Sequence, residues 1–204
     1  MRLAALLLAV LLAGCMSTPP PSRARSGRAP QPRSAGSTEG GPTLRAADLE
    51  AAIHAGTNAA RRRQRLAPLA YAQPLAGVAR RYSEDMARRG FFGHVDPDGR
   101  DATDRAARHG VTCRVAVGNR IYEGVNENLA QDWRFSGWQD RRSATGTTRT
   151  YTWLTRDQIA DRTVQGWMDS PGHRRNLLNP NVSREGLGVY IAADGAIYIT
   201  QLLC

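Results

Sequence analysis

The sequence predicts an α+β domain in which helices pack on an antiparallel sheet. Helical patterns dominate between Ala46 and Leu178, whereas the segment from Gly186 onwards alternates between apolar and polar residues as strands do. Helices first and strands last are typical of this fold class. The chain has 204 residues, and the part that follows Thr43 is long enough to bury the core of one domain.

Three helices are expected in the first half of this domain. They are predicted at residues 46–64, 73–89 and 101–109. In the first, Leu49, Ile53 and Ala60 form an apolar stripe, and three arginines occupy the last turn, where the helix dipole favours positive charge. Gly90 ends the second helix and Gly110 ends the third, because glycine readily adopts the left-handed conformation that closes a helix.

Two more helices are expected before the final strands. Thr155 and Gln158 match a capping box, which predicts that a helix begins there and buries Trp167. Ser170 then caps a short helix that runs to Leu178.

The chain is expected to end in a β-hairpin. Residues 186–192 and 196–203 alternate, and Asp194-Gly195 supplies the turn between them. A weaker pattern allows a strand within residues 111–125.

The segment 132–153 is predicted to be an aromatic and basic insertion that forms a protruding hairpin. Five aromatic residues flank a polar middle that is rich in glycine and threonine. The aromatics could stack, together with Arg141 and Arg142, on sugars or on a partner surface. Alternatively, they cover the flank of their own domain. The sequence does not decide between these two interpretations.

The N-terminus carries the pattern of an export signal. Arg2 precedes an apolar run that is too short to span a bilayer, which predicts a signal peptide at residues 1–14. Leu12-Ala13-Gly14-Cys15 resembles a bacterial lipobox, so we expect cleavage before Cys15 and acylation of that cysteine. Residues 15–43 are rich in Pro, Ser, Gly and Arg and predict a disordered tether, which leaves residues 44–204 as the folded domain.

These features predict an exported lipoprotein whose membrane contact is its acylated N-terminus. No aspartate follows Cys15 to resemble an inner-membrane retention signal, which favours the outer membrane or its periplasmic face. The formal net charge is +10, and all 28 basic residues are arginine, as expected of a coding bias rather than of a binding surface. Since an exported domain without a clear basic groove is unsuited to nucleic acid, no nucleic-acid partner is expected. The oligomeric state stays open.

Two cysteines lie within the domain, Cys113 and Cys204. The oxidising compartment of an exported protein favours a disulfide between them. Two buried free thiols are the alternative, because spacing alone does not show proximity.

Several motifs, in their order and spacing, resemble the bacterial exported branch of the CAP superfamily. This SCP-like family includes cysteine-rich secretory proteins, antigen five and plant pathogenesis-related proteins. The matching residues are Asn58 and Arg61, Leu75, Ala79, Tyr82 and Met86, His94-x-x-Pro97-x-Gly99, Glu127-Asn128-Leu129-Ala130, Trp167 with Ser170-Pro171-Gly172-His173-Arg174-x-Asn176, and Gly186-x-Gly188. The resemblance implies a three-layer α-β-α sandwich with an antiparallel central sheet.

The resemblance also implies a cleft formed by His94, Glu127 and His173. Ser170 stands where eukaryotic members have a glutamate, with Asp169 beside it. We therefore expect Asp169, Ser170 and Asn128 as cleft neighbours. Asn126 stands where the family usually has glycine.

Two chemistries fit this triad of side chains. Two imidazoles and a carboxylate suit a divalent cation such as zinc, which could activate a water molecule. Without metal, Glu127 would hold one imidazole by a charge-assisted hydrogen bond and raise its pKa. The first chemistry predicts a metal-dependent peptidase or peptidoglycan hydrolase. The second predicts a module that binds a lipid, a glycan or an envelope protein, and we take it as the leading hypothesis. The other histidines, His54 and His109, are assigned no role in the site.

The lipobox yields a direct prediction. Each buried methylene contributes about 0.8 kcal/mol, so a multiply acylated Cys15 would anchor the protein stably. Mass spectrometry of the mature protein is expected to find an N-terminal, acylated Cys15. An unmodified N-terminus elsewhere would contradict the lipoprotein prediction.

Overall fold

The computed structural model describes residues 41–204. The predicted signal peptide, Cys15 and most of the tether lie outside the described residues. Within the described part of the chain, no helix is both long and apolar enough to cross a membrane.

A four-stranded sheet forms the middle of the domain, with the strand order β1-β7-β8-β4. Its strands are β1 (Ala70–Tyr71), β7 (Arg184–Ile191), β8 (Ala196–Leu203) and β4 (Asn126–Trp133). β7 and β8 form the predicted hairpin, and β8 also pairs antiparallel to β4, a strand that the sequence analysis did not identify. The two-residue strand β1 pairs parallel to β7. The expected antiparallel sheet therefore has one short parallel strand at its edge, which the sequence analysis missed.

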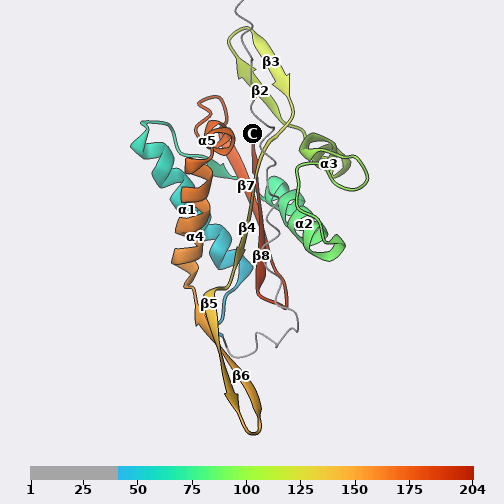
Figure 1. Cartoon of the computed structure of the whole chain (residues 1–204). Helices are drawn as coiled ribbons and strands as arrows, with labels where there is room; N and C mark the ends of the chain where they lie inside the picture. The colour runs from blue at the N-terminus through green and yellow to red at the C-terminus, as the bar shows by residue number, and fades with distance from the viewer. Residues whose placement is uncertain (1–40) are drawn as a thin grey trace, which may run out of the picture. The chain divides into compact units, whose positions relative to one another are not determined.

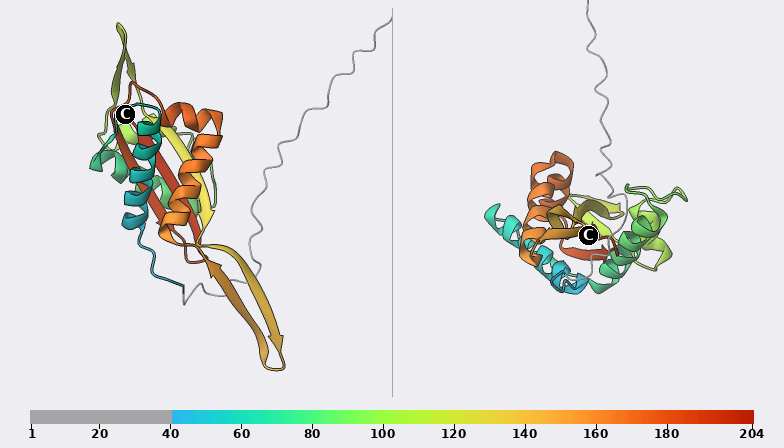
Figure 2. Two further views of the ribbon diagram at one scale, coloured as in Figure 1. Left: turned by 90° about the vertical axis from the view of Figure 1, so that its left-hand side faces the viewer. Right: turned by 60° about the horizontal axis from the view of Figure 1, so that its bottom comes forward.

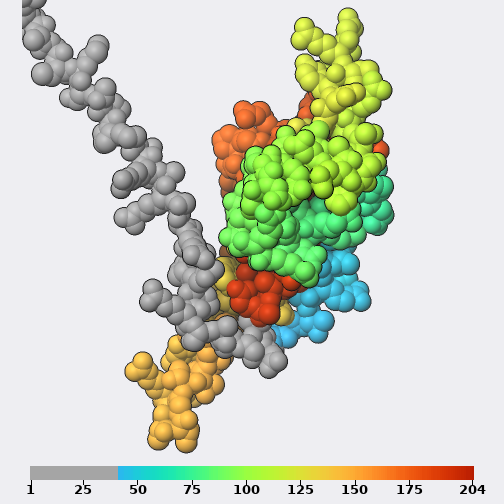
Figure 3. Space-filling view, turned by 90° about the vertical axis from the view of Figure 1, so that its right-hand side faces the viewer, coloured from blue at the N-terminus to red at the C-terminus, as the bar shows by residue number. Residues whose placement is uncertain are grey.

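Helices cover both faces of this sheet (Figure 1). The helices are α1 (Ala46–Arg63), α4 (Arg156–Asp169) and α5 (Pro171–Leu177) on one face, and α2 (Gln73–Arg89) and α3 (Ala102–Arg108) on the other. The first face buries apolar side chains such as Ile53, Trp167 and Leu187, and the second buries Leu75, Val78 and Leu202. This is the three-layer α-β-α sandwich that the family resemblance implied. Figure 3 shows the face that α2 and α3 cover.

Two hairpins lie outside the central sheet. They are β2 (Arg114–Val117) with β3 (Arg120–Glu123), and β5 (Phe135–Ser143) with β6 (Gly146–Trp153). The first accounts for the weak pattern within 111–125. The second is the predicted protruding hairpin, and Figure 2 shows it extending beyond the helices. It begins at Phe135, because Asp132 and Trp133 complete strand β4 of the central sheet.

Most aromatics of the 132–153 segment pack against one another. The Phe135 ring is buried and lies 4.7 Å from that of Tyr151 and 5.5 Å from that of Trp133, between ring centroids. Trp138 differs, since 41% of it is exposed and the Arg149 guanidinium lies 5.4 Å from its ring. Most of these rings therefore cover the flank of their own domain. Among the described residues of the hairpin, Trp138 is the one large aromatic with a substantially exposed face.

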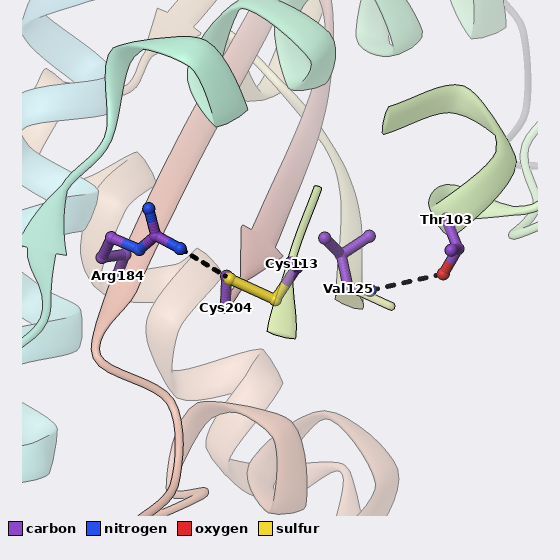
Figure 4. Close-up of a disulfide and its surroundings, with 5 residues drawn as sticks. All are labelled: Thr103, Cys113, Val125, Arg184 and Cys204. Atoms are coloured by element: carbon purple, nitrogen blue, oxygen red, sulfur yellow. Dashed lines mark hydrogen bonds between the residues drawn. A yellow bond between two sulfur atoms is a disulfide. The ribbon is translucent and has the colours of Figure 1, made fainter. Parts of the chain in front are cut away.

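A disulfide joins Cys113 to Cys204 and ties the base of the β2–β3 hairpin to the last strand (Figure 4). The two cysteines are 91 residues apart in sequence and their Cα atoms are 5.6 Å apart. The Arg184 guanidinium contacts Cys204 Sγ at 3.1 Å. The sequence left open a disulfide or two buried free thiols, and the structure contains the disulfide.

Helix α2 lies directly on β7, and glycine makes this approach possible. A Cβ built on Gly186 or Gly188 would stand 2.2 Å or 2.1 Å from backbone atoms of α2. No real Cβ tolerates such contacts, so any side chain at these positions must push the helix away from the sheet.

We therefore predict that Gly188→Ala destabilises the fold by at least about 3 kcal/mol, at or above the usual cost of overpacking. Urea unfolding measures the loss. Gly137→Ala is the matched control, because a Cβ at Gly137 meets no atom within 4 Å. Equal stability of the two variants would contradict the proposed helix–strand contact.

Candidate functional site

His94 lies in the loop that follows α2. Gly90 ends this helix with a left-handed backbone (φ 70°), and the chain then turns through Asp96. The buried Asp96 carboxylate accepts hydrogen bonds from the Asp98 and Arg100 amides and from the Arg100 guanidinium. Burial alone would raise the pKa of Asp96, but these hydrogen bonds together lower it. The acidic turn is thus a self-contained scaffold that presents His94.

Glu127, on β4, lies behind His94 and is almost fully buried. Its Oε1 is 2.9 Å from His94 Nδ1, and its Oε2 accepts a hydrogen bond from the Arg105 guanidinium at 2.5 Å. Both carboxylate oxygens are therefore bound to cationic or protonatable side chains. The predicted Glu127–imidazole hydrogen bond is present in the structure.

Arg105 was not foreseen as a site residue, yet it has the most contacts in the site. Besides Glu127, its guanidinium donates to the backbone carbonyls of His94 (3.1 Å) and Arg100 (2.7 Å). It also lies 3.3 Å above the centre of the Tyr82 ring, which is a cation–π contact. One sequence signal could have revealed it, since Arg105 occurs with Ala102 and Ala106 on the buried stripe of a short helix. An arginine on such a stripe needs a buried partner.

His173 approaches from the other face of the sheet, in the first turn of α5. Its ring centroid is 6.3 Å from that of His94. The Asn128 amide donates to the His173 carbonyl at 3.1 Å, and the Asn176 amide donates to the Glu127 carbonyl, also at 3.1 Å. His94 and His173 therefore meet at the outer edge of strand β4, with Glu127 beneath His94.

Of the three predicted cleft neighbours, two lie beside the histidines and one does not. Asn128 is fully buried, and its side-chain amide holds the backbone of His173 through a hydrogen bond to the His173 carbonyl. Ser170 occupies the N-cap position of α5, although its side chain makes no capping hydrogen bond, and it lines a cavity beside His173. Asp169 is exposed and accepts a hydrogen bond from Gln165 one turn back on α4, so the structure does not bring its carboxylate to the two histidines.

The two histidines differ in their protonation. The hydrogen bond to Glu127 raises the pKa of His94, and this outweighs the opposing effect of burial. Burial, followed by the nearby His94, lowers the pKa of His173. Raising the pKa of His94 extends its charged form to higher pH, whereas lowering the pKa of His173 favours its neutral form. The two imidazoles of the site are thus shifted in opposite directions.

A cavity of about 420 Å³ opens beside His173, between α4 and β4. Phe92, Leu129 and Trp167 supply apolar surface, and Gln131 and the Asp132–Arg162 ion pair (3.0 Å) supply polar surface. The exposed fraction of Phe92 is 48%, which is high for an aromatic ring. The cavity is large enough for part of a small ligand or for a segment of a polymer.

A polar network also reaches this edge from α1. Glu185 is fully buried; its Oε1 lies 2.5 Å from His54 Nδ1 and its Oε2 accepts from the Gln201 amide at 2.6 Å. Gln201 in turn accepts a hydrogen bond from Asn128 at 2.9 Å. His54 is therefore part of a hydrogen-bonded chain that ends beside His173, a connection that the sequence analysis did not predict.

The residues of the cleft do not fit a zinc ion in this arrangement. Among residues 41–204, no group of three or more His, Cys, Asp and Glu side chains is placed to hold a metal. Glu127 has given both oxygens to His94 and Arg105, and the fixed positive charge of Arg105 would repel a second cation nearby. The zinc expectation thus gains no support from the geometry.

The fold and the site define the class of protein: an α-β-α sandwich in which two histidines from distant segments share a cleft. The sequence also matches the CAP family, described as the cysteine-rich secretory protein family, over residues 54–203. The chain belongs to this family.

The similar proteins are bacterial. The chain is 28% identical over 147 residues to YkwD of Bacillus subtilis and 29% identical over 133 residues to the membrane protein YlbC of the same species. These alignments cover 72% and 65% of this chain but only 44% and 29% of the two relatives. The chain thus spans less than half the length of the curated relatives that it matches.

Solved structures show the same fold. An extracellular protein with an SCP domain from Bacillus anthracis is 28% identical, with a TM-score of 0.54, and covers 80% of this chain and 44% of its own. An outer surface protein from Borrelia burgdorferi has a TM-score of 0.57 at 15% identity and covers 80% of this chain and 96% of its own. The second likeness concerns the fold alone.

The Arg105–Glu127 pair generates a stability prediction. Removing one partner of a buried ion pair costs about 3–5 kcal/mol, because the other charge is left buried without compensation. Arg105→Met is expected to lose about this much in urea unfolding. Arg108→Gln, on the same helix but exposed, should change stability by less than about 0.5 kcal/mol. A loss below about 1 kcal/mol for Arg105→Met would contradict the assigned contacts.

Proposed function

We propose that this protein is an exported, lipid-anchored module of the bacterial envelope that binds a glycan strand beside His173 without cleaving it. The state of Glu127 is the observation that carries this proposal. A carboxylate whose two oxygens are bound to Arg105 and His94 is poorly placed to act as a general base or as a metal ligand. The Glu127 hydrogen bond also orients the His94 imidazole before any ligand arrives, as a preformed binding surface requires.

The cavity supports a glycan over an acyl chain. Its surface combines the exposed ring of Phe92, which can cover the apolar face of a sugar, with the polar side chains of Gln131, Asp132 and Arg162. An acyl chain would make no use of these polar groups. His173 lies at the margin of the cavity, and its neutral form, which its lowered pKa favours, can accept a hydrogen bond from a sugar hydroxyl.

Export and anchoring rest on the N-terminal pattern around Cys15. The Bacillus anthracis relative, described as extracellular, and the Borrelia burgdorferi outer surface protein with the same fold are consistent with that location. A protein held at the membrane through its N-terminus would meet envelope glycans at high local concentration.

The cavity can be tested by filling it. Gly166 lines it on α4, and a Cβ there meets no atom within 4 Å, so we expect the side chain of Gly166→Leu to occupy part of the cavity. We predict that soluble peptidoglycan glycan strands bind the full-length protein in calorimetry and that Gly166→Leu weakens binding at least about tenfold, or about 1.4 kcal/mol.

Gly77→Leu is the matched control on the opposite face of the sheet, because its Cβ would make only ordinary contacts with the Arg81 side chain. It should bind as the unchanged protein does. Three results would overturn the proposal: strands that bind both variants equally, phosphatidylglycerol vesicles that bind in place of glycan, and chelator-sensitive cleavage of the strands. The last would establish the hydrolase alternative.

A further inference from the structure

A second cavity, of about 310 Å³, lies between α2 and the α3 segment, and the cleft histidines do not line it. Figure 3 shows the face on which these elements lie. Arginine dominates its walls, with Arg81 from α2, Arg100 from the preceding loop, and Arg105 and Arg108 from α3. Four guanidinium groups around one cavity repel one another unless anionic groups balance their charges.

Two of the four are balanced by carboxylates. Arg100 pairs with Asp96 at 2.8 Å, and Arg105 pairs with Glu127 at 2.5 Å. The other acidic residue of the wall, Asp85, pairs with Arg89 at 3.3 Å. The carboxylates of the wall are thus bound to arginines other than Arg81 and Arg108.

Arg81 and Arg108 have no carboxylate partner among the described residues. Arg81 instead donates its Nε–H to Nε2 of His109 at 3.2 Å. An imidazole that accepts this hydrogen bond must be neutral and carry its proton on Nδ1. Burial, followed by the charges of Arg81 and Arg108, lowers the pKa of His109. Two guanidinium groups without a carboxylate partner therefore border the cavity, with the neutral imidazole of His109 beside them.

We propose that this cavity is a binding site for a phosphate-type oxyanion, held by Arg81, Arg108 and His109. Guanidinium groups present paired N–H donors that match the oxygens of a phosphate, and a dianion would balance both free arginines. Asp85, Asp96 and the neighbouring Asp98 share two arginines, Arg89 and Arg100, so the attraction of Arg81 and Arg108 for the anion acts against one unmatched carboxylate charge. A cavity of this volume holds a phosphate together with a small organic group.

This proposal is independent of the glycan site beside His173, because it rests on different side chains and a different cavity. Arg105, Tyr82, Asp96 and Arg100 line this cavity and also support the His94 cleft, and all four are left unchanged in the test. The phosphate could belong to a soluble metabolite or to a lipid headgroup, since both present the same oxygens.

The test titrates the full-length protein with inorganic phosphate at constant ionic strength and follows His109 by NMR. A bound dianion stabilises the protonated imidazole, so the pKa of His109 is expected to rise when phosphate binds. Arg81→Gln combined with Arg108→Gln should weaken phosphate binding at least tenfold and abolish the rise. Arg88→Gln is the control, because Arg88 lies on the same helix, is exposed and pairs with Glu84.

Two further probes identify the source of the phosphate. Glycerol phosphate and phosphatidic acid vesicles are compared with acetate and phosphatidylcholine vesicles. The site is supported if either phosphate probe binds and if this binding depends on Arg81 and Arg108. The probe that binds more tightly identifies the source of the phosphate. Failure of phosphate to shift the pKa of His109 at 10 mM, roughly the weakest affinity of interest, overturns the proposal. Unchanged binding in the double variant, or acetate binding as tightly as phosphate, also overturns it.

Discussion

The buried ion pair between Arg105 and Glu127 is the constraint on which the cleft depends. Two opposite charges are removed from water here, and such a pair is stable only when the remaining hydrogen-bonding groups also find partners. Arg105 meets this condition through two backbone carbonyls and the face of Tyr82, and Glu127 meets it through His94. The pair thereby links α2, α3, the His94 loop and strand β4, and it fixes the imidazole that faces His173.

The position of the cleft follows from the sheet. β4 is an outer strand, and an outer strand exposes backbone groups that must be protected. Here Asn176 donates to the carbonyl of Glu127, and the Trp167 indole donates to that of Leu129 at 3.0 Å. The same contacts that protect the edge bring α4 and α5, and with them His173, next to His94. The same set of contacts therefore protects the strand and assembles the cleft.

Much of this could be predicted from the sequence, because its signals are local or depend on known motifs. The capping box at Thr155 and the alternation of β8 indicated their elements correctly, and the motif order placed His94, Glu127 and His173 together. Arg105 was missed because arginine is so frequent in this chain that it had been discounted as a signal. The parallel pairing of β1 was also missed, since a two-residue strand carries no periodic pattern. The route from His54 through Glu185 to Asn128 depends on contacts between residues far apart in sequence, which no local pattern encodes.

The most direct test of this account is an NMR pH titration of the four histidines, assigned by single His→Gln variants and recorded with and without equimolar zinc. If Arg105 and Glu127 organise the cleft without metal, the pKa of His94 lies above its ordinary value, that of His173 lies below it, and zinc changes neither. If micromolar zinc instead displaces the protons of His94 and His173 together, the cleft is a metal site and the central role assigned to Arg105 is wrong.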